Sequence, residues 1–292
     1  SLTLDLKEYT IQASSTSEYC MFKVNGSGKF TIQGNGTIDA STGGADVRTA
    51  ISVEDTTASV NIISGTIIGK YRGVEVQKGT ANISGGTVQY TTDMDTSSAV
   101  YISGKSSSAE ISGNAQIVGK NAAVRVYGGK LNVKDSATLE GNFGVMLFNK
   151  NSQNSDKVPH ASFTMSGGTI TATSGFALSG NNLQSAQCSA KITGGKLEQT
   201  SGETCIYWPM EGNLTIGGTA VVEGGSAIEA KMGTIEIQGN AQLIGNGKYL
   251  DEEPPHGYSQ ADGSAILVSA QMYGANNGQY IDSPALTVKI EG

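Results

Sequence analysis

Carboxylates are gathered in two predicted loops of this chain. One loop, residues 91–98, contains Asp93 and Asp95. The other, residues 246–264, contains Asp251, Glu252, Glu253, His256 and, near its end, Asp262. Within 251–256 the carboxylates could bind calcium or act as an acid/base pair, and the alternative is an ordinary solvated loop. The two loops lie about six repeats apart, roughly 29 Å, so we do not expect them to form one paired-carboxylate site.

The cysteines and histidines do not form a metal-binding pattern. Cys20, Cys188 and Cys205 have unrelated spacings and no CxxC, and His160 and His256 each follow a proline in predicted loops. We therefore predict no zinc, no other metal and no cofactor. Each cysteine is expected to be a small buried hydrophobe with a reduced thiol.

Aromatic residues at recurring positions suggest a different chemistry, the binding of sugars. The candidates are Tyr101, Tyr127, Phe148 and Tyr207, with Arg125 among them. Flat rings beside polar side chains suit sugar stacking, provided that one surface presents them all. The alternative is that the insertion at 149–160 folds over this stripe and buries it.

Composition limits the partners that the chain could have. Its 292 residues carry a net charge of −7 with no Lys/Arg cluster, which argues against nucleic acid. No apolar run of about 18 residues occurs, so we expect no membrane span. Because Ser1 is not a natural start, we expect that a leader has been removed and that the protein is extracellular.

Two short phrases repeat along the sequence. The phrase Ala-x-apolar-x-Gly occurs at 115–119, 137–141, 220–224 and 241–245. The phrase apolar–small polar–Gly–Gly or Asn occurs at 32–35, 83–86, 111–114, 165–168, 192–195 and 237–240. The repeat is about 21 residues at its shortest and is lengthened by insertions, as in a stack of structural repeats.

Each repeat contains three short runs that alternate with the period of a β-strand. In 123–141 the inward residues are Val124 and Val126, then Leu131 and Val133, then Leu139, and we name these runs strands a, b and c. The b–c corner is glycine-rich because a sharp bend needs positive φ. Since a hairpin cannot join parallel strands, a climbing coil is required.

The predicted fold is all-β: one domain over 1–292, a single right-handed parallel β-helix of about ten three-stranded coils. An antiparallel sandwich also has many short strands but lacks phrases of fixed period. A left-handed hexapeptide helix would need strict six-residue repeats, which are absent. Trp208, beside Pro209, is expected in the core.

The short b–c corner, the variable other loops and the segment Gly34-Asn35-Gly36-Thr37-Ile38-Asp39 resemble the pectin-lyase-like superfamily. This resemblance implies the β-helix fold. The superfamily includes lyases, hydrolases, phage tailspikes and non-catalytic adhesins, and the Gly/Ser/Thr-rich coils of low charge look most like the adhesins. The Gly-His-Gly motif of its hydrolases is absent.

A lyase of that superfamily would need acidic ligands beside a basic residue on strand a. The outward column of strand a is predicted to be Glu75, Tyr101, Arg125, Met146, Leu178, Tyr207, Glu229 and Leu267. Arg125 has the right chemistry, but no carboxylate adjoins it in this column. The catalytic residues of the superfamily are therefore not carried over.

We accordingly expect a non-catalytic extracellular surface module, adhesin-like or glycan-binding. Its ligand-binding residues would be Tyr101, Arg125, Tyr127, Phe148 and Tyr207, and its partners glycans or a host surface. The alternatives are a polysaccharide lyase or glycoside hydrolase with a divergent site on the strand-a face, and a phage or secretion fibre. We favour a monomer over the trimer that a fibre would form.

The two ends of the chain should be strands of incomplete coils. The alternating run 2–6 is predicted to stack under the first coil, with a weak cap at most, and 285–290 is predicted to be strand b of a last coil. We expect the natural chain to continue past Gly292, as a segment of a larger surface protein.

Overall fold

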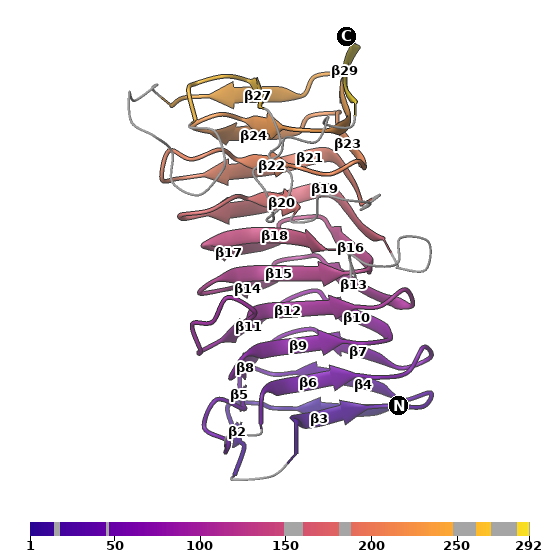
Figure 1. Cartoon of the computed structure of the whole chain (residues 1–292). Coiled ribbons are helices and arrows are strands. Elements are labelled where there is room, and N and C mark those ends of the chain that lie inside the picture. The colour runs from indigo at the N-terminus through magenta and orange to yellow at the C-terminus, as the bar shows by residue number, and fades with distance from the viewer. Residues whose placement is uncertain are drawn as a thin grey trace, which may run out of the picture.

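The computed structural model of the protein is all-β and consists of parallel strands in two long sheets (Figure 1). The structure describes residues 1–14, 18–44, 47–148, 160–180, 188–247, 261–269 and 285–291. Within these ranges no element is an α-helix, and hence no helix could span a membrane.

Ten strands form the first sheet, which we call the ten-stranded sheet. Within the described ranges, each pairs only with the members before and after it, in chain order. They are β3 (Cys20–Val24), β6 (Thr49–Val53), β9 (Arg72–Val76), β12 (Ser98–Ser103), β15 (Ala122–Tyr127), β18 (Phe143–Phe148), β20 (Leu178–Gly180), β22 (Ile206–Trp208), β25 (Ile228–Ala230) and β28 (Ile266–Val268).

The second sheet has 19 strands among the described residues, in two parallel rows. The strand-b row contains β1 (Leu2–Asp5), β4 (Lys29–Gln33), β7 (Ser59–Ile62), β10 (Gly79–Ile83), β13 (Ser107–Ile111), β16 (Gly129–Val133), β23 (Asn213–Ile216), β26 (Gly233–Gln238) and β29 (Leu286–Glu291). The strand-c row contains β2 (Thr10–Gln12), β5 (Thr37–Asp39), β8 (Thr66–Gly69), β11 (Thr87–Tyr90), β14 (Gln116–Val118), β17 (Thr138–Gly141), β24 (Val221–Gly224) and β27 (Gln242–Gly245). β19 (Ala161–Ala172) and β21 (Ser189–Gln199) belong to both rows.

The chain visits the sheets in a fixed order, one strand of the ten-stranded sheet and then one of each row. β6, β7, β8 and β9 show this order, and β9 returns to pair with β6. Every pairing found among the described residues is parallel, which excludes the antiparallel sandwich. The arrangement is compatible with the predicted stack of coils, and the termini lie at opposite ends of it (Figure 1).

The core lies between the sheets and consists of apolar columns. One column runs through Ile51, Val74, Val100, Val124, Val145, Leu178, Ile206 and Ile228 at paired positions of successive strands. All of these residues are fully buried, as is Trp208, which confirms its predicted place. Burial of one such aliphatic side chain contributes about 1.5–3 kcal/mol, so the columns supply the main stabilising term.

The b–c corner follows its prediction in most repeats, but Asp135, at φ 60°, takes the place of glycine after β16, and the corners in β19 and β21 also differ. There the glycine pairs Gly167–Gly168 and Gly194–Gly195 lie inside continuous strands. Pairing persists through the corner because Ser166 pairs with Gly194 across a register shift. The bend therefore lies within two continuous strands, at two register shifts that offset each other.

We expect Gly86→Ala to destabilise the protein strongly. Gly86 has φ +74°, and a Cβ there would lie 2.4 Å from the carbonyl oxygen of Gly65, the corner glycine of the preceding repeat. The control is Gly202→Ala, because Gly202 has φ +91° but nothing within 4 Å of an added Cβ. Positive φ should cost both variants about 1–3 kcal/mol.

The steric contact should cost Gly86→Ala a further ~1–3 kcal/mol. Urea unfolding followed by circular dichroism measures the difference. Equal losses of unfolding free energy in the two variants would show that the corners of successive repeats are not packed closely enough to exclude a side chain.

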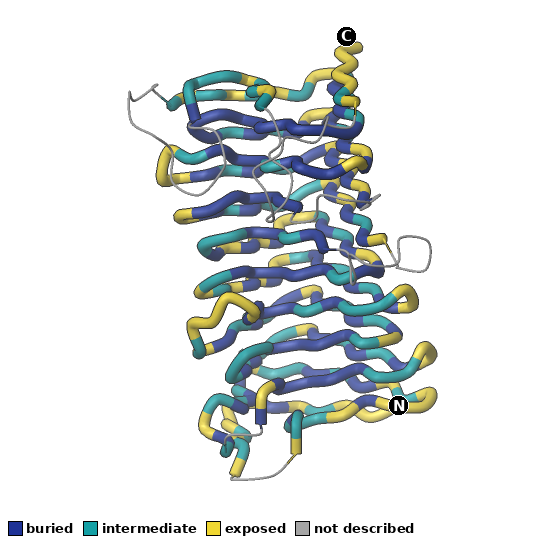
Figure 2. Tube along the Cα trace, viewed as in Figure 1, coloured by how far each residue is buried: buried dark blue, intermediate teal, exposed yellow. Residues whose placement is uncertain are grey.

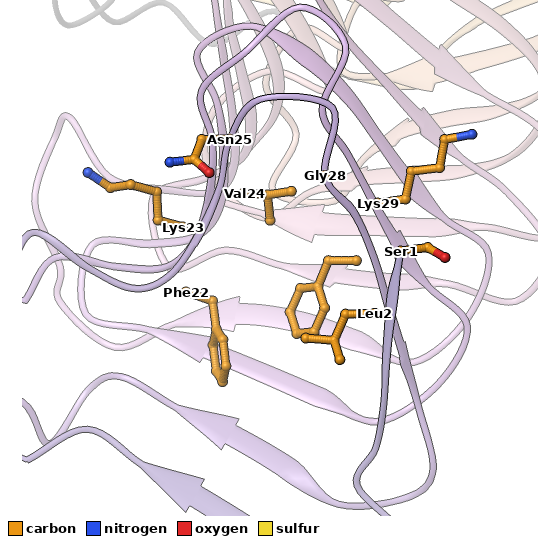
Figure 3. A pocket seen from close by; sticks show the side chains of 9 residues that line it. Ser1, Leu2, Phe22, Lys23, Val24, Asn25, Gly28 and Lys29 are labelled. Atoms are coloured by element: carbon orange, nitrogen blue, oxygen red, sulfur yellow. The ribbon is translucent and has the colours of Figure 1, made fainter.

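Both end strands were predicted correctly. β1 pairs with β4, and β29 pairs with β26 over six positions. A hollow of about 320 Å³ opens beside β1, and the side chains of Leu2 and Phe22 lie on its wall (Figure 3). The hollow lies at the N-terminal end of the apolar core, where the Phe22 and Phe30 rings pack with their centroids 5.4 Å apart.

Candidate functional site

The outward column of the ten-stranded sheet differs from its prediction at one position. Met146 pairs with Ser179, and Ser179 pairs with Tyr207, so Ser179 rather than Leu178 belongs to the column. Leu178 pairs with Val145 and points into the core. The other predicted members keep their places: Glu75, Tyr101, Arg125, Met146, Tyr207, Glu229 and Leu267.

Three of the predicted sugar-binding residues form a ladder of rings on the outer side of this sheet. Tyr127 stacks on Phe148 with centroids 4.3 Å apart and an interplanar angle of 7°. Tyr101 covers the other side of Tyr127 at 5.3 Å and 33°. Tyr127 and Phe148 occupy paired positions of strands that lie about 4.8 Å apart, so their rings can stack face to face, whereas Tyr101 approaches Tyr127 from two residues along the neighbouring strand. Tyr127 therefore offers a ligand its edge and hydroxyl, and not the flat face that sugar stacking requires.

Tyr207 lies in a second aromatic group of the same sheet. It stacks on Phe176 at 4.9 Å and 16°, and the Lys231 ammonium lies 5.4 Å from its centroid. Phe176 in turn contacts Phe143 at 6.0 Å. Tyr101, Tyr127 and Tyr207 thus lie on one sheet and are half-buried, whereas Phe148 is buried.

Arg125 holds a loop. Its side chain is 5% exposed, and its guanidinium donates to the carbonyl oxygens of Asp95 and Ser97 and to Oδ1 of Asn121 at 2.7 Å. Asp95 and Ser97 belong to the loop 91–97 between β11 and β12, whose first six residues lie mainly at the surface (Figure 2). The guanidinium also lies 5.4 Å from the Phe148 ring. Arg125 therefore links the ring ladder to the loop.

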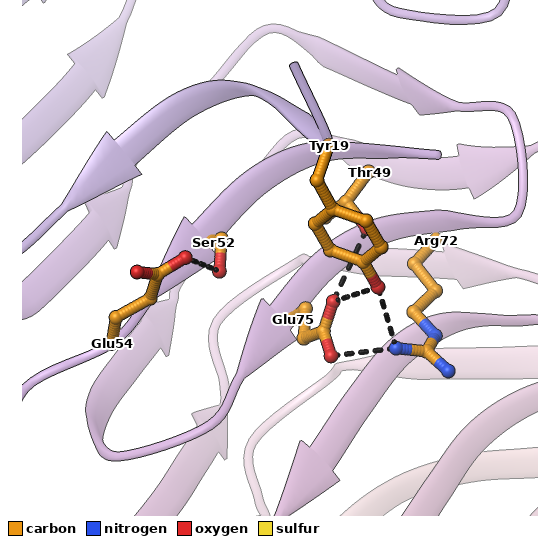
Figure 4. A network of polar contacts seen from close by, with 6 residues as sticks. All are labelled: Tyr19, Thr49, Ser52, Glu54, Arg72 and Glu75. Carbon is orange, nitrogen blue, oxygen red and sulfur yellow. Dashed lines mark hydrogen bonds and ion pairs between the residues drawn. The ribbon is translucent and has the colours of Figure 1, made fainter. Parts of the chain in front are cut away.

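A polar network at the start of three strands was not predicted. The Nη1 group of Arg72 donates to Oε1 of Glu75 at 2.6 Å and to the Tyr19 hydroxyl at 3.0 Å (Figure 4). The Tyr19 hydroxyl donates to Oε2 of Glu75 at 2.6 Å, and Thr49 donates to the same oxygen at 3.2 Å. The Arg72 guanidinium lies 3.6 Å from the centroid of the Tyr101 ring, so the network adjoins the ladder.

A hollow of about 170 Å³ opens beside this network. Its wall consists of Tyr19, Arg48, Tyr71, Arg72, Met94 and Thr96. Tyr19, Arg48 and Tyr71 each directly precede a strand of the ten-stranded sheet, and backbone bonds of 2.9 Å join Arg48 to Tyr19 and Tyr71 to Arg48. The parallel stacking of repeats thus places one aromatic or basic side chain above another.

Burial sets the protonation of Tyr19. Desolvation, followed by the hydrogen bond and the charge of Glu75, raises the pKa of its phenol above the ordinary value. A folded-state pKa above the unfolded one adds stability that is complete below about pH 10 and is lost as pH rises through the folded value.

We therefore expect Tyr19→Phe to flatten the alkaline loss of stability. The unfolding free energy of the wild type should fall more steeply between about pH 9 and pH 11 than that of the variant. Near neutral pH the variant should lose about 1.5–3 kcal/mol, because the hydroxyl donates to the Glu75 carboxylate and accepts from the Arg72 guanidinium. Tyr9→Phe, at a ring that is 72% exposed, should keep the wild-type dependence. Parallel curves for wild type and Tyr19→Phe would contradict the role of this phenol.

The remaining predicted groups are not brought together. His160, Asp93 and Asp95 are exposed, and no three His, Cys, Asp or Glu side chains of the described ranges are grouped to hold a metal ion. The carboxylates at 251–253 and His256 lie outside the described residues, as does 149–159, the segment expected to cover the aromatic stripe.

The three cysteines are buried and carry free thiols, as expected for small core residues. Burial raises the pKa of the Cys20 and Cys188 thiols to about 11 and raises that of Cys205 further.

Sequence reasoning missed Arg72, Glu75 and Tyr19 as a group for a geometric reason. On a regular strand, residues three apart point to opposite faces. Arg72 is the first residue of β9 and nevertheless forms an ion pair with Glu75, with Nη1 and Oε1 2.6 Å apart. One sequence feature could have predicted the group: Tyr19, Arg48 and Tyr71 each stand immediately before a strand of the ten-stranded sheet.

Comparison with protein-family models, with curated proteins and with solved structures finds no match to this chain.

Proposed function

We propose that the protein is a right-handed parallel β-helix of the pectin-lyase-like type. Strand order and parallel pairing support the coil, since each strand pairs with its equivalents in the repeats before and after. Right-handedness follows from the general rule that crossovers between parallel strands of one sheet are almost always right-handed.

Its proposed role is that of a non-catalytic extracellular surface module that binds glycans on the outer side of the ten-stranded sheet. The observation that supports it best is the register of Tyr101 with Arg125 and of Ser103 with Tyr127 on β12 and β15. This register presents half-buried phenols at neighbouring strands, with ring centroids 5.3 Å apart. An extended chain of sugars lying along the stack would meet a phenol edge at each of these strands.

The contact is expected to be polar rather than a flat stacking. Phe148 and Tyr101 cover the faces of Tyr127, and Arg72 covers one face of Tyr101. The phenol hydroxyls can both donate to and accept from sugar hydroxyls. Both rings are held by neighbours before any ligand arrives, which lowers the entropic cost of binding.

Tyr19 and Arg125 weigh against the alternative, a divergent lyase or hydrolase. A tyrosine acting as a general base needs a lowered pKa, whereas that of Tyr19 is raised by burial. The Nε and Nη2 donors of Arg125 are engaged with Ser97, Asp95 and Asn121, and the residue is buried, so its guanidinium holds the loop and is not presented to a substrate. We therefore assign Tyr19 and Arg125 a structural role and not a catalytic one.

Affinity electrophoresis in gels that contain neutral or acidic polysaccharides tests this proposal. We expect at least one polysaccharide to retard the wild type, and the double variant Tyr101→Phe/Tyr127→Phe to be retarded several-fold less. This variant keeps the ring ladder and removes only the hydroxyls, so it should remain folded. Tyr9→Phe removes a distant exposed hydroxyl and should behave as wild type. Equal retardation of all three proteins, or of none, would refute the proposal.

A further inference from the structure

The hollow beside Tyr19 differs in chemistry from the ring ladder of Tyr101, Tyr127 and Phe148. Its volume of about 170 Å³ is below the ~300 Å³ at which pockets for drug-sized ligands begin. It would therefore hold one small molecule or the terminal unit of a larger one. Its wall combines two tyrosine rings, two guanidinium groups, a thioether and a hydroxyl, which suits an organic body carrying a negative charge.

Arg48 is the most available cation of this hollow. Arg48 is exposed, and its guanidinium carbon lies 5.9 Å from the centroid of the Tyr71 ring. Among the described residues it forms no ion pair. A guanidinium above a ring keeps its N–H donors in its own plane, where they can meet an oxyanion in a bidentate arrangement.

Arg72 provides a second set of donors in a fixed position. Its Nη1 group is used by Glu75 and Tyr19, and within the described ranges no hydrogen bond is found for Nε or Nη2. In Figure 4 the Nη2 nitrogen is turned away from Glu75. Because Glu75 offsets the charge of Arg72, the net positive charge of the hollow comes from Arg48.

The surrounding charges limit how many negative charges a ligand could carry. Asp93 and Asp95 lie in the loop that contributes Met94 and Thr96, and Glu18 precedes Tyr19. All three are exposed and none lines the hollow. Their carboxylates, and the net charge of −7, would repel a polyanion but leave room for one oxyanion group at Arg48.

We propose that this hollow binds a small ligand, or the end of a larger one, that carries a single oxyanion group. The group would be a carboxylate or a sulfate or phosphate monoester. Arg48 is the main anion contact, Arg72 supplies further N–H donors, and Tyr71 and Met94 pack against the body of the ligand. This site does not depend on the glycan contact proposed for Tyr101 and Tyr127.

Isothermal titration at constant ionic strength tests the site with four probes: glucuronate, the sulfate monoester of glucose, the phosphate monoester of glucose, and glucose itself. At least one of the acids should bind the wild type tenfold or more tightly than glucose, and the order of the three acids identifies the preferred group. Arg48→Gln should weaken that acid about tenfold, the factor equivalent to ~1.4 kcal/mol. Lys78→Gln removes an exposed cation outside the hollow and should stay within about twofold of wild type.

Arg48 is exposed, so its substitution should leave the fold intact, and circular dichroism checks this. Three results would overturn the proposal: glucose binding as tightly as the best acid, no acid binding at all, or equal effects of Arg48→Gln and Lys78→Gln. The variant Tyr101→Phe/Tyr127→Phe should keep its affinity for the acid even if it loses polysaccharide binding, so the two sites can fail separately.

Discussion

Lys231→Met is expected to cost about 3–5 kcal/mol of unfolding free energy, because it removes the ammonium group that faces a buried carboxylate. Lys231 Nζ lies 3.4 Å from Oε1 of Glu229, and the two side chains are 2% and 0% exposed. Ser269 also donates to that oxygen at 2.6 Å, but a hydroxyl brings no compensating charge. Burial of a carboxylate without a cation is among the most destabilising changes that a single substitution makes.

A second ion pair of nearly the same length provides the control. Lys289 Nζ lies 3.3 Å from Oε1 of Glu236, with side chains that are 52% and 32% exposed. Lys289→Met should cost only about 0–1 kcal/mol, because water already screens this pair. The double variant Lys231→Met/Glu229→Gln should regain most of the loss, since it removes both charges. Urea unfolding of the four proteins gives these values, and similar losses in the two lysine variants would contradict the burial of Glu229.

Trp208→Ala is expected to cost about 3–5 kcal/mol, the usual range for removing a large buried ring. Trp208 ends β22 with its side chain in the core, fully buried, and its Nε1–H donates to the Gly212 carbonyl oxygen at 3.3 Å. Trp208→Phe should cost less, because it keeps most of the ring volume and loses one hydrogen bond.

The same residue reports on the fold, because it is the only tryptophan in the chain. Its native emission should be that of an apolar environment and should shift to longer wavelength on unfolding, together with the loss of circular dichroism. Native emission typical of solvent-exposed tryptophan, or a cost for Trp208→Ala below that of Trp208→Phe, would contradict the inward assignment.

The strands and the core could be predicted well from the sequence, because apolar and polar residues alternate along the strands of each repeat. Val124 and Val126 lie on one side of β15 with Arg125 between them, and in most repeats a glycine corner marks where strand b ends. The prediction that Leu178 points outward was wrong. Ala177 and Leu178 are both apolar, so alternation alone does not identify which of them points into the core. A slip of one residue reverses the face of a strand, and only the pairing with Val145 settles it.

The site was less predictable than the fold, because it depends on contacts between repeats. The column on strand a could be read from the sequence, but the stacking that covers the faces of Tyr127 follows from ring orientations. The bonds from Arg125 to the carbonyl oxygens of Asp95 and Ser97 depend on how the loop 91–97 folds back, which no local pattern encodes. The hollow at Arg48 arises in the same way, from residues that lie far apart in the sequence.

The measurement that tests the central proposal most directly is a product analysis after long incubation. The polysaccharide that retards the protein most in affinity electrophoresis is incubated with the protein, and its chain length, reducing ends and unsaturated-uronate absorbance are followed. A non-catalytic glycan-binding module predicts retardation with no change in any of the three. Shortened chains that require the folded protein would contradict it and would establish the alternative, a polysaccharide-cleaving enzyme.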